Sequence, residues 1–528
     1  MELKRKGGVL AHITSFPSKY GIGDLGKGTT EFLDFLYNAD QKLWQILPLG
    51  PTSFGDSPYQ CFSTFAGNQY IISLDILIDK GYLSELDLKD CPDFSKNKVE
   101  YGKVIKYKNE IFKKAKINFY NKLKGETKKA YEKFVKDSLW LEDYALFMAL
   151  KYYFINERDN TFETQEWHLY KKENEKNLTK AQINDYFYGA VWNTWPKELV
   201  DRTPKALKEW KEKLKEDIEL HKFLQFEFFQ QWKDIKTYAN KKGIEIIGDI
   251  PIFVAMDSAD VWCNKELFKL DEKGNPIGVA GCPPDYFEKT GQLWGNPLYD
   301  WVENKNEGYK WWIRRTEAML KIVDYIRIDH FRGFDEYWAI PYGDLTAENG
   351  VWEKGPGKDL FKTIEKALEK LPIIAEDLGE ITKSVVKLRD DLKLPGMKIL
   401  HFAFQMQSNN AYLPHNIKNS NCVIYTGTHD NDTSIGWYEK TTENERDYLR
   451  RYLNVSGENV AWDLIRLAWS SSANFAIVPI QDILSEGSES RMNKPGSAEG
   501  NWQYRITEGS VTSDLAEKMA YLNELFER

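Results

Sequence analysis

The sequence predicts an α/β protein built on a closed parallel (β/α)8 (TIM) barrel with large, mostly helical insertions. Eight short apolar runs with strand character recur along the chain, and segments with helical periodicity separate most of them. No GxGxxG follows any of these runs, which disfavours a doubly wound open sheet, the alternative fold in which strands and helices also alternate.

The predicted strands cover residues 8–14, 43–49, 244–254, 323–329, 371–377, 397–404, 422–430 and 474–484. Helix-like segments between them include residues 28–39, 308–321 and 359–371. The spacing is uneven, and the chain is too long for one ordinary core. We therefore expect residues 1–50 to form the first part of the barrel, 51–242 a mainly helical insertion between strands 2 and 3, and 243–528 the remainder, with a loop-rich insertion at 255–300.

The charge balance excludes some classes of partner. The chain carries 72 Lys and Arg against 80 Asp and Glu, a formal net charge of −8. Such a chain gains nothing electrostatically from a phosphate backbone or an anionic bilayer, so we expect no nucleic-acid and no membrane partner. It has neither an apolar run long enough for a membrane span nor a signal peptide, and its five cysteines form no CxxC. We expect a cytoplasmic protein.

Aromatic residues make up 14% of the chain, and many lie beside Gly, Pro and Asn in loop-like stretches such as 292–301 and 55–70. A large core accounts for part of this content. Aromatic faces on loops are also suited to stacking on sugar rings or other flat, partly apolar ligands.

Acidic residues lie where several predicted strands end. Asp329 ends the fourth strand, Glu376 the fifth and Asp430 the seventh, while Asp249 lies within the third. In a (β/α)8 barrel the carboxyl ends of the strands form one rim, which carries the chemistry. We therefore expect these acids to converge although they are far apart in the sequence.

The alternation of a strand places Arg327 and Asp329 on one face, with Ile326 and Ile328 on the other. A guanidinium beside a carboxylate lowers its pKa, so we expect Asp329 to stay ionised, although a purely structural salt bridge remains an alternative. Glu376 follows an apolar strand, where burial and nearby acids would raise its pKa. Two carboxyls with divergent pKa values facing one cleft are typical of glycosidic-bond chemistry.

Two alternatives concern the histidines and the sequence THDND at 428–432. The Asx residues of THDND could simply cap backbone N–H groups in a turn. His330 beside Asp329, and His429 beside Asp430, could be metal ligands. The chain contains no HExxH and no HxH, however, and sugar chemistry needs no metal, so we expect neither a metal nor a cofactor.

Longer motifs resemble one family. YIRIDHFRG, AEDLG and YTGTHDND are similar to the signature strands of the 4-α-glucanotransferases called amylomaltase or disproportionating enzyme, which are glycoside hydrolase family 77 in the α-amylase superfamily. So are GDIPIFVAMDSADVW, AGCPPDYFEKTGQLWGNPLYDW and NKPGSAEGNWQYR. The third strand carries GDIPIFV rather than the Asp–Asn–His motif of ordinary α-amylases. The resemblance extends from about residue 8 to residue 505.

The resemblance implies a role for each matching residue. Asp329 would be the nucleophile, Glu376 the acid/base, and Asp430 the third carboxylate, which holds sugar hydroxyls. Arg327 would orient Asp329. The other residues that we expect to bind substrate are Tyr59, Asp249, Asp285, Trp294, His330 and His429, with the loop 279–296 and the loop 493–501 covering the cleft.

The resemblance further implies a retaining 4-α-glucanotransferase that moves α-1,4-glucan segments between maltooligosaccharides. Two other hypotheses stay open, a retaining α-glucan hydrolase and a non-catalytic glucan-binding barrel. The sequence leaves the oligomeric state, the preferred chain lengths and the role of the helical insertion undetermined.

Overall fold

The computed structural model describes residues 3–159, 164–175, 183, 190–284, 289–379, 381–405, 410–497 and 500–528. Its centre is an eight-stranded parallel sheet in the order β10-β11-β12-β1-β2-β3-β6-β9. The strands are β1 (Lys6–Leu10), β2 (Leu43–Gln45), β3 (Glu245–Pro251), β6 (Tyr325–Asp329), β9 (Ile373–Ala375), β10 (Gly396–Ile399), β11 (Cys422–Tyr425) and β12 (Phe475–Pro479).

The two edge strands of this sheet meet and close it into a barrel. The Ala375 N–H, at the end of β9, donates to the carbonyl of Pro395, next to β10, over 2.9 Å. Each of the eight predicted runs overlaps one strand, so the predicted barrel is confirmed. Most strands are shorter than predicted, because several runs continue past the sheet into the loops of the rim.

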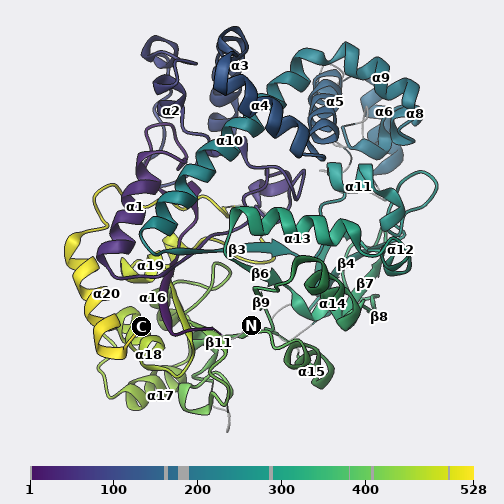
Figure 1. Ribbon diagram of the computed structural model, residues 1–528. Coiled ribbons are helices and arrows are strands. Elements are labelled where there is room, and N and C mark those ends of the chain that lie inside the picture. Colours follow the sequence, from purple (N-terminus) through teal and green to yellow (C-terminus); the bar gives the residue numbers. More distant parts are fainter. Residues whose placement is uncertain are drawn as a thin grey trace.

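A ring of helices covers the barrel (Figure 1). Around it, α14, α13, α10, α1, α20 and α18 contact one another in succession. Their bounds are α1 (Lys27–Asn38), α10 (Lys215–Lys241), α13 (Lys310–Ile322), α14 (Gly357–Leu368), α18 (Val460–Ser470) and α20 (Ser513–Phe526). The remaining barrel helices are α12 (Trp301–Asn306), α15 (Lys383–Asp391), α16 (Ser434–Lys440), α17 (Glu443–Leu453) and α19 (Ile480–Ile483).

The segment between β2 and β3 is mainly helical and forms a separate layer at the top of Figure 1. It contains α2 (Leu74–Asp79), α3 (Tyr101–Lys122), α4 (Gly125–Asp137), α5 (Leu141–Asp159), α6 (Gln165–Asn174), α8 (Lys197–Val200), α9 (Pro204–Lys213) and α10. Apolar residues of α10 recur at helical spacing and are buried: Leu224, Phe228, Trp232, Ile235 and Ala239. Because α10 contacts α3 and α5 as well as α1, α13 and β3, it joins this layer to the barrel.

A second sheet lies beside the barrel, near α12 in Figure 1. It is antiparallel, in the order β5-β4-β7-β8, with β4 (Gly278–Cys282), β5 (Gln292–Pro297), β7 (Glu336–Pro341) and β8 (Val351–Lys354). The predicted loop-rich insertion 255–300 thus also contains two strands and α11 (Ala259–Cys263). The sequence pattern missed the strands because β4 pairs with β7, a strand from a different excursion of the chain.

Within the described ranges, no helix combines the length and the apolar character that crossing a bilayer requires.

Candidate active site

The strand β6 presents its charged residues to the inside of the barrel. Ile326 and Ile328 are buried on the outer side, where they share a small cavity with residues of α13 and α14. Arg327 and Asp329 project the other way, and Arg327 Nη2 donates to Asp329 Oδ1 over 3.0 Å. The alternation predicted for this segment is therefore confirmed.

Arg327 also connects β6 to the neighbouring strand. Its Nη1 donates to Asp249 Oδ2 from β3, and Asp249 lies directly opposite Arg327 in the strand register. The Tyr59 hydroxyl donates to the same carboxylate oxygen over 2.7 Å. Asp249 is fully buried and Arg327 only 2% exposed, so the guanidinium is fixed between two carboxylates in a site that excludes most water.

The expected low pKa of Asp329 is wrong. Burial raises the pKa of Asp329 to about 6, and it outweighs the opposing attraction of Arg327. The charges of Asp249 and Asp430 raise the pKa further. A carboxyl with this pKa is still mostly ionised at pH 7, which is the form that a nucleophile requires.

Glu376 follows β9 and lies beside Asp329. Burial first, and then the charge of Asp329, raise the pKa of Glu376 to about 7, as the sequence predicted. Its carboxylate accepts the backbone N–H of His330 over 2.7 Å and that of Leu378 over 2.9 Å. A carboxyl that titrates near neutrality is matched to proton transfer in both directions.

His330 adopts a left-handed backbone conformation, with φ +56°. This conformation is unfavourable for a residue with a side chain and is typical of functional sites. It turns the chain sharply at the end of β6, and the His330 N–H then points to Glu376. Burial lowers the pKa of the His330 imidazole to about 3, so the ring is neutral.

The segment after β11 supplies His429 and Asp430. His429 Nε2 lies 3.3 Å from Asp430 Oδ2, and the Asn493 side-chain amide donates to Asp430 Oδ1 over 2.6 Å. Burial favours the protonated form of Asp430, but the interactions with His429, Asn493 and Arg327 outweigh it and hold the pKa well below the usual range. Asp430 is thus ionised near neutral pH.

The aromatic residues predicted to bind sugar lie around these acids. The Tyr59 ring stacks on the His429 ring with 5.2 Å between centroids, so part of its face is already covered by protein. Trp294, on β5, meets His330 edge to face at 4.8 Å. Asp285 lies outside the described residues.

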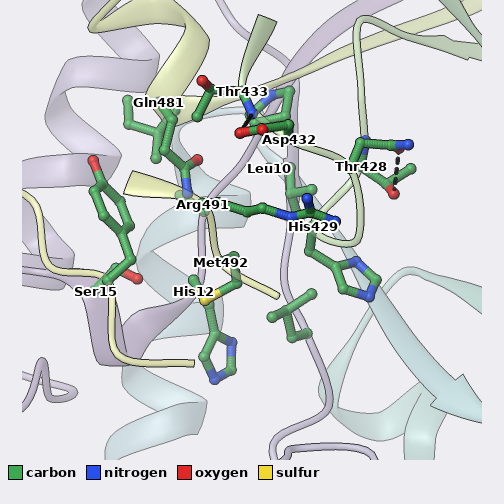
Figure 2. Close-up of a pocket in the computed structure, with 16 residues that line it drawn as sticks. Leu10, His12, Ser15, Thr428, His429, Asp432, Thr433, Gln481, Arg491 and Met492 are labelled. Atoms are coloured by element: carbon green, nitrogen blue, oxygen red, sulfur yellow. Dashed lines mark hydrogen bonds between the residues drawn. The ribbon is translucent and has the colours of Figure 1, made fainter. Parts of the chain in front are cut away.

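Sequence patterns alone missed two residues near this site, Arg491 and His12. Arg491 Nη2 donates to the carbonyl of Asp430 over 2.6 Å and its Nε to the carbonyl of Asn493 over 2.7 Å. Figure 2 shows its side chain reaching toward His429 across a pocket that His12 also lines. Arg491 adjoins the motif NKPGSAEGNWQYR, which begins at Asn493 and is the only indication of its place.

Two acids near the strand ends do not join the site. The carboxylate of Asp377 accepts the Met397 N–H and pairs with Arg389, and that of Asp432 accepts the Thr433 N–H and pairs with Lys440. The turn-capping interpretation of THDND therefore holds for Asp432 but not for Asp430. Among the described residues, no group of His, Cys, Asp and Glu is arranged to hold a metal ion.

The site and the barrel can be compared with known proteins. A family model described as 4-alpha-glucanotransferase matches residues 11–512. The chain belongs to this family. A 4-alpha-glucanotransferase of Synechocystis is 47% identical over 99% of this chain and 98% of its own length. One from Thermus thermophilus is 45% identical over the full length of both chains.

Solved structures agree with this membership. An amylomaltase from Streptococcus agalactiae, in complex with acarbose, gives a TM-score of 0.90 at 37% identity, covering 99% of this chain and 100% of its own. An amylomaltase from Corynebacterium glutamicum, at 18% identity and a TM-score of 0.71, over 99% of this chain and 74% of its own, shares the fold. The family resemblance predicted from the motifs is confirmed, and the chain is an enzyme, a carbohydrate-active transferase.

Proposed function

We propose that this enzyme is a retaining 4-α-glucanotransferase that works through a covalent glucosyl intermediate on Asp329. One observation carries the proposal: Asp329 and Glu376 end adjacent strands and face each other with pKa values of about 6 and about 7. Near neutral pH, Asp329 is then ionised while part of Glu376 is protonated, which are the forms that the first step needs.

In the first step, Glu376 protonates the glycosidic oxygen of the donor while Asp329 attacks the anomeric carbon. The bond to the leaving sugar breaks and a glycosyl ester forms. In the second step, Glu376 removes the proton from the 4-hydroxyl of an acceptor, whose oxygen displaces Asp329. Double displacement retains the configuration and predicts carboxyl groups about 5–5.5 Å apart.

The remaining polar groups are assigned to substrate. Asp430, held charged by His429 and Asn493, is placed to bind sugar hydroxyls and to stabilise positive charge at the anomeric centre. We assign the neutral imidazole of His330 and the pair of His429 and Asp430 to hydroxyl contacts as well.

The aromatic residues are assigned to the sugar rings. We assign Trp294, and Asp285, which precedes β5 in the sequence, to the acceptor side, and Tyr59 to the opposite wall. The substrates are maltooligosaccharides or α-1,4-glucans. The acarbose bound to the S. agalactiae enzyme supports this class.

The products of maltotriose test the proposal. Transfer predicts glucose together with a ladder of oligosaccharides longer than maltotriose, separated by chromatography. A mixture of shorter sugars alone would instead make the enzyme a hydrolase. The Asp329→Asn variant should form neither, whereas a non-catalytic binding barrel would behave identically before and after this change.

A chelator tests the expectation that no metal takes part. Activity after treatment with EDTA should equal that of the untreated enzyme. Strict dependence on an added divalent ion would contradict the proposed chemistry.

A further inference from the structure

The segment 426–434, which carries His429 and Asp430, is held at both ends by one buried carboxylate. Asp482 lies in α19, just after β12, and is 1% exposed. Its Oδ2 accepts the Thr426 hydroxyl over 2.6 Å and the Ser434 hydroxyl over 2.7 Å. Its Oδ1 accepts the Ser434 N–H over 2.7 Å. The carboxylate therefore ties Thr426, the residue after β11 (Cys422–Tyr425), to Ser434, the first residue of α16.

His401, after β10, extends this network. The Ser434 hydroxyl donates its proton to Asp482, so it can only accept from His401 Nε2, which lies 3.1 Å away. The backbone N–H of His401 donates to the carbonyl of Thr426 over 3.2 Å. A Cβ on Gly427 would lie only 2.7 Å from His401 Cε1, so the imidazole packs directly against the backbone of the segment.

Helix capping does not explain Asp482. The helix α16 already has a capping residue, because Thr433 Oγ1 accepts the Gly436 N–H over 3.1 Å. Within the described part of the chain, Asp482 has no ion pair with a basic side chain. Burying a carboxylate without a cation costs several kcal/mol unless hydrogen bonds satisfy it. In the described structure, the side-chain hydrogen bonds of Asp482 all go to Thr426 or Ser434, the two ends of the Asp430 segment.

The segment between these ends is internally braced. Asn431 Oδ1 accepts both the N–H and the hydroxyl of Thr428, each over 2.9 Å. Figure 2 shows Thr428 and Thr433 on either side of the backbone that leads to His429. A segment that is braced inside and fixed at both ends holds its side chains in one place.

We propose that Asp482 is a positioning residue for Asp430 and His429. It acts through Thr426 and Ser434, touches no substrate itself, and keeps the Asp430 carboxylate within reach of His429, Asn493 and the sugar. The proposal rests on the role of Asp430 given above. A carboxylate that must meet all of these partners tolerates displacement of only a few tenths of an ångström.

The Asp482→Asn variant tests the proposal through kinetics. The amide that replaces the carboxylate has an NH2 group, which cannot accept hydrogen bonds from the Thr426 and Ser434 donors. The segment should therefore lose its fixed position. Outer partners of functional groups typically contribute tenfold to hundredfold. We expect kcat to fall by about this factor and inhibition by acarbose to weaken, while the pH dependence of kcat/KM keeps both limbs, because Asp329 and Glu376 are untouched.

Asp24→Asn is the matched control. Asp24 is also buried and accepts similar donors, the Gly26 N–H over 2.9 Å and the Ser18 hydroxyl over 3.0 Å, and in the described part of the chain its carboxylate has no hydrogen bond to a site residue. It should lower thermal stability and leave kcat within about twofold of the wild type. If both variants lose kcat in proportion to their loss of stability, Asp482 is merely structural and the proposal fails.

A double-mutant cycle separates this proposal from the proposed function. In an Asp430→Asn background, Asp482→Asn should cost less than twofold in kcat, because the group that it positions is already lost. A full tenfold cost in that background overturns the positioning role. Near-normal activity of Asp430→Asn alone would instead contradict the role of Asp430 in the proposed function.

If Asp482→Asn does not fold, Thr426→Val and Ser434→Ala test the proposal in its place. Each removes one donor to the carboxylate and should lower kcat about threefold to tenfold. Thr426→Ser, which retains the hydroxyl, should restore the activity that Thr426→Val loses. Failure of this restoration, or no effect of either deletion, would overturn the proposal.

Discussion

The partly buried carboxyl groups on the two sides of the barrel rim have pKa values that are shifted in opposite directions. On the side of β6 and β9, the pKa of Asp329 rises to about 6 and that of Glu376 to about 7. On the side of β11, the pKa of Asp430 falls well below its usual range. Burial favours protonation in all three, so the difference comes from the partners.

Those partners explain which group can move a proton. Asp430 has His429 on one oxygen and the Asn493 amide on the other, and it stays charged. Among the described residues, Glu376 accepts from two backbone N–H groups, and the like charge of Asp329 lies close to it. In Asp329 and Glu376, burial therefore outweighs the stabilising partners, whereas in Asp430 the partners outweigh burial. The variants below test this difference, beginning with the largest expected effect.

Asp329→Asn removes the group on which the reactive side depends. The amide keeps the shape and accepts from Arg327, but it cannot form the glycosyl ester. We expect transfer from maltotriose to fall roughly 10⁴-fold or more, as for other enzyme nucleophiles. Product formation over hours measures it, and a loss of tenfold or less would contradict the assignment of Asp329.

Asn493→Ala weakens the interactions that hold Asp430, on the β11 side, and leaves Asp329 and Glu376 unchanged. It removes the 2.6 Å hydrogen bond to Asp430, and bonds to charged groups contribute about 1.5–3 kcal/mol. We expect kcat/KM to fall roughly tenfold to hundredfold with both limbs of the pH profile unchanged. Asn304→Ala, which removes a buried amide of α12 that donates to the carbonyls of Leu267 and Asp300, is the control and should keep kcat/KM. A displaced acidic limb would contradict this expectation, because the charge of Asp430 raises the pKa of Asp329 and should persist without Asn493.

The pH profile of the wild type tests the pKa values of Asp329 and Glu376 directly. Asp329 must be ionised, so kcat/KM should fall as the pH drops through about 6. Glu376 must be protonated in the first step, so kcat/KM should also fall as the pH rises through about 7. The result is a narrow bell whose two apparent pKa values belong to the coupled pair. A plateau from pH 5 to pH 9 would contradict the raised pKa values of Asp329 and Glu376.

The sequence predicted the barrel and the convergence of the three acids because both follow from local rules. Strand periodicity and the position of each acid at a strand end are visible in a run such as YIRID, and they fix which side chains share the rim. The low pKa expected for Asp329 was wrong because it was argued from Arg327, a neighbour in the same strand. Burial at the assembled rim raises the pKa instead, and the charges of Asp249 and Asp430, which come from other strands, raise it further.

Other features depend on contacts that no local pattern contains. The pairing of β4 with β7 joins two excursions of the chain, and the network of Asp482 joins the ends of three strands. The contact of Tyr59 with His429 and Asp249 likewise appears only once the loop is placed on the barrel. Long-range partners of this kind determine the charge state of the site.

Glu376→Gln should give the smallest effect, a pH-dependent change in thermal stability whose direction follows from the raised pKa of Glu376. The pKa of Glu376 is raised in the folded state, so the stability of the wild type is complete below the unfolded pKa of about 4.3 and declines as the pH rises through about 7. Glutamine does not titrate. The difference in thermal midpoint between variant and wild type should therefore shift in favour of the variant between pH 5 and pH 8, by the equivalent of about 1–3 kcal/mol.

The control for this shift is Glu353, a carboxyl whose pKa is lowered in the folded protein. Burial of Glu353 is outweighed by Lys269 and Tyr337, which lower its pKa, so its contribution is present above the unfolded pKa and is lost only in acid. The difference between Glu353→Gln and wild type should therefore stay constant from pH 5 to pH 8. If Glu376→Gln also gives a constant difference, the folded protein does not raise the pKa of Glu376, and the contrast between the two sides of the rim loses its basis.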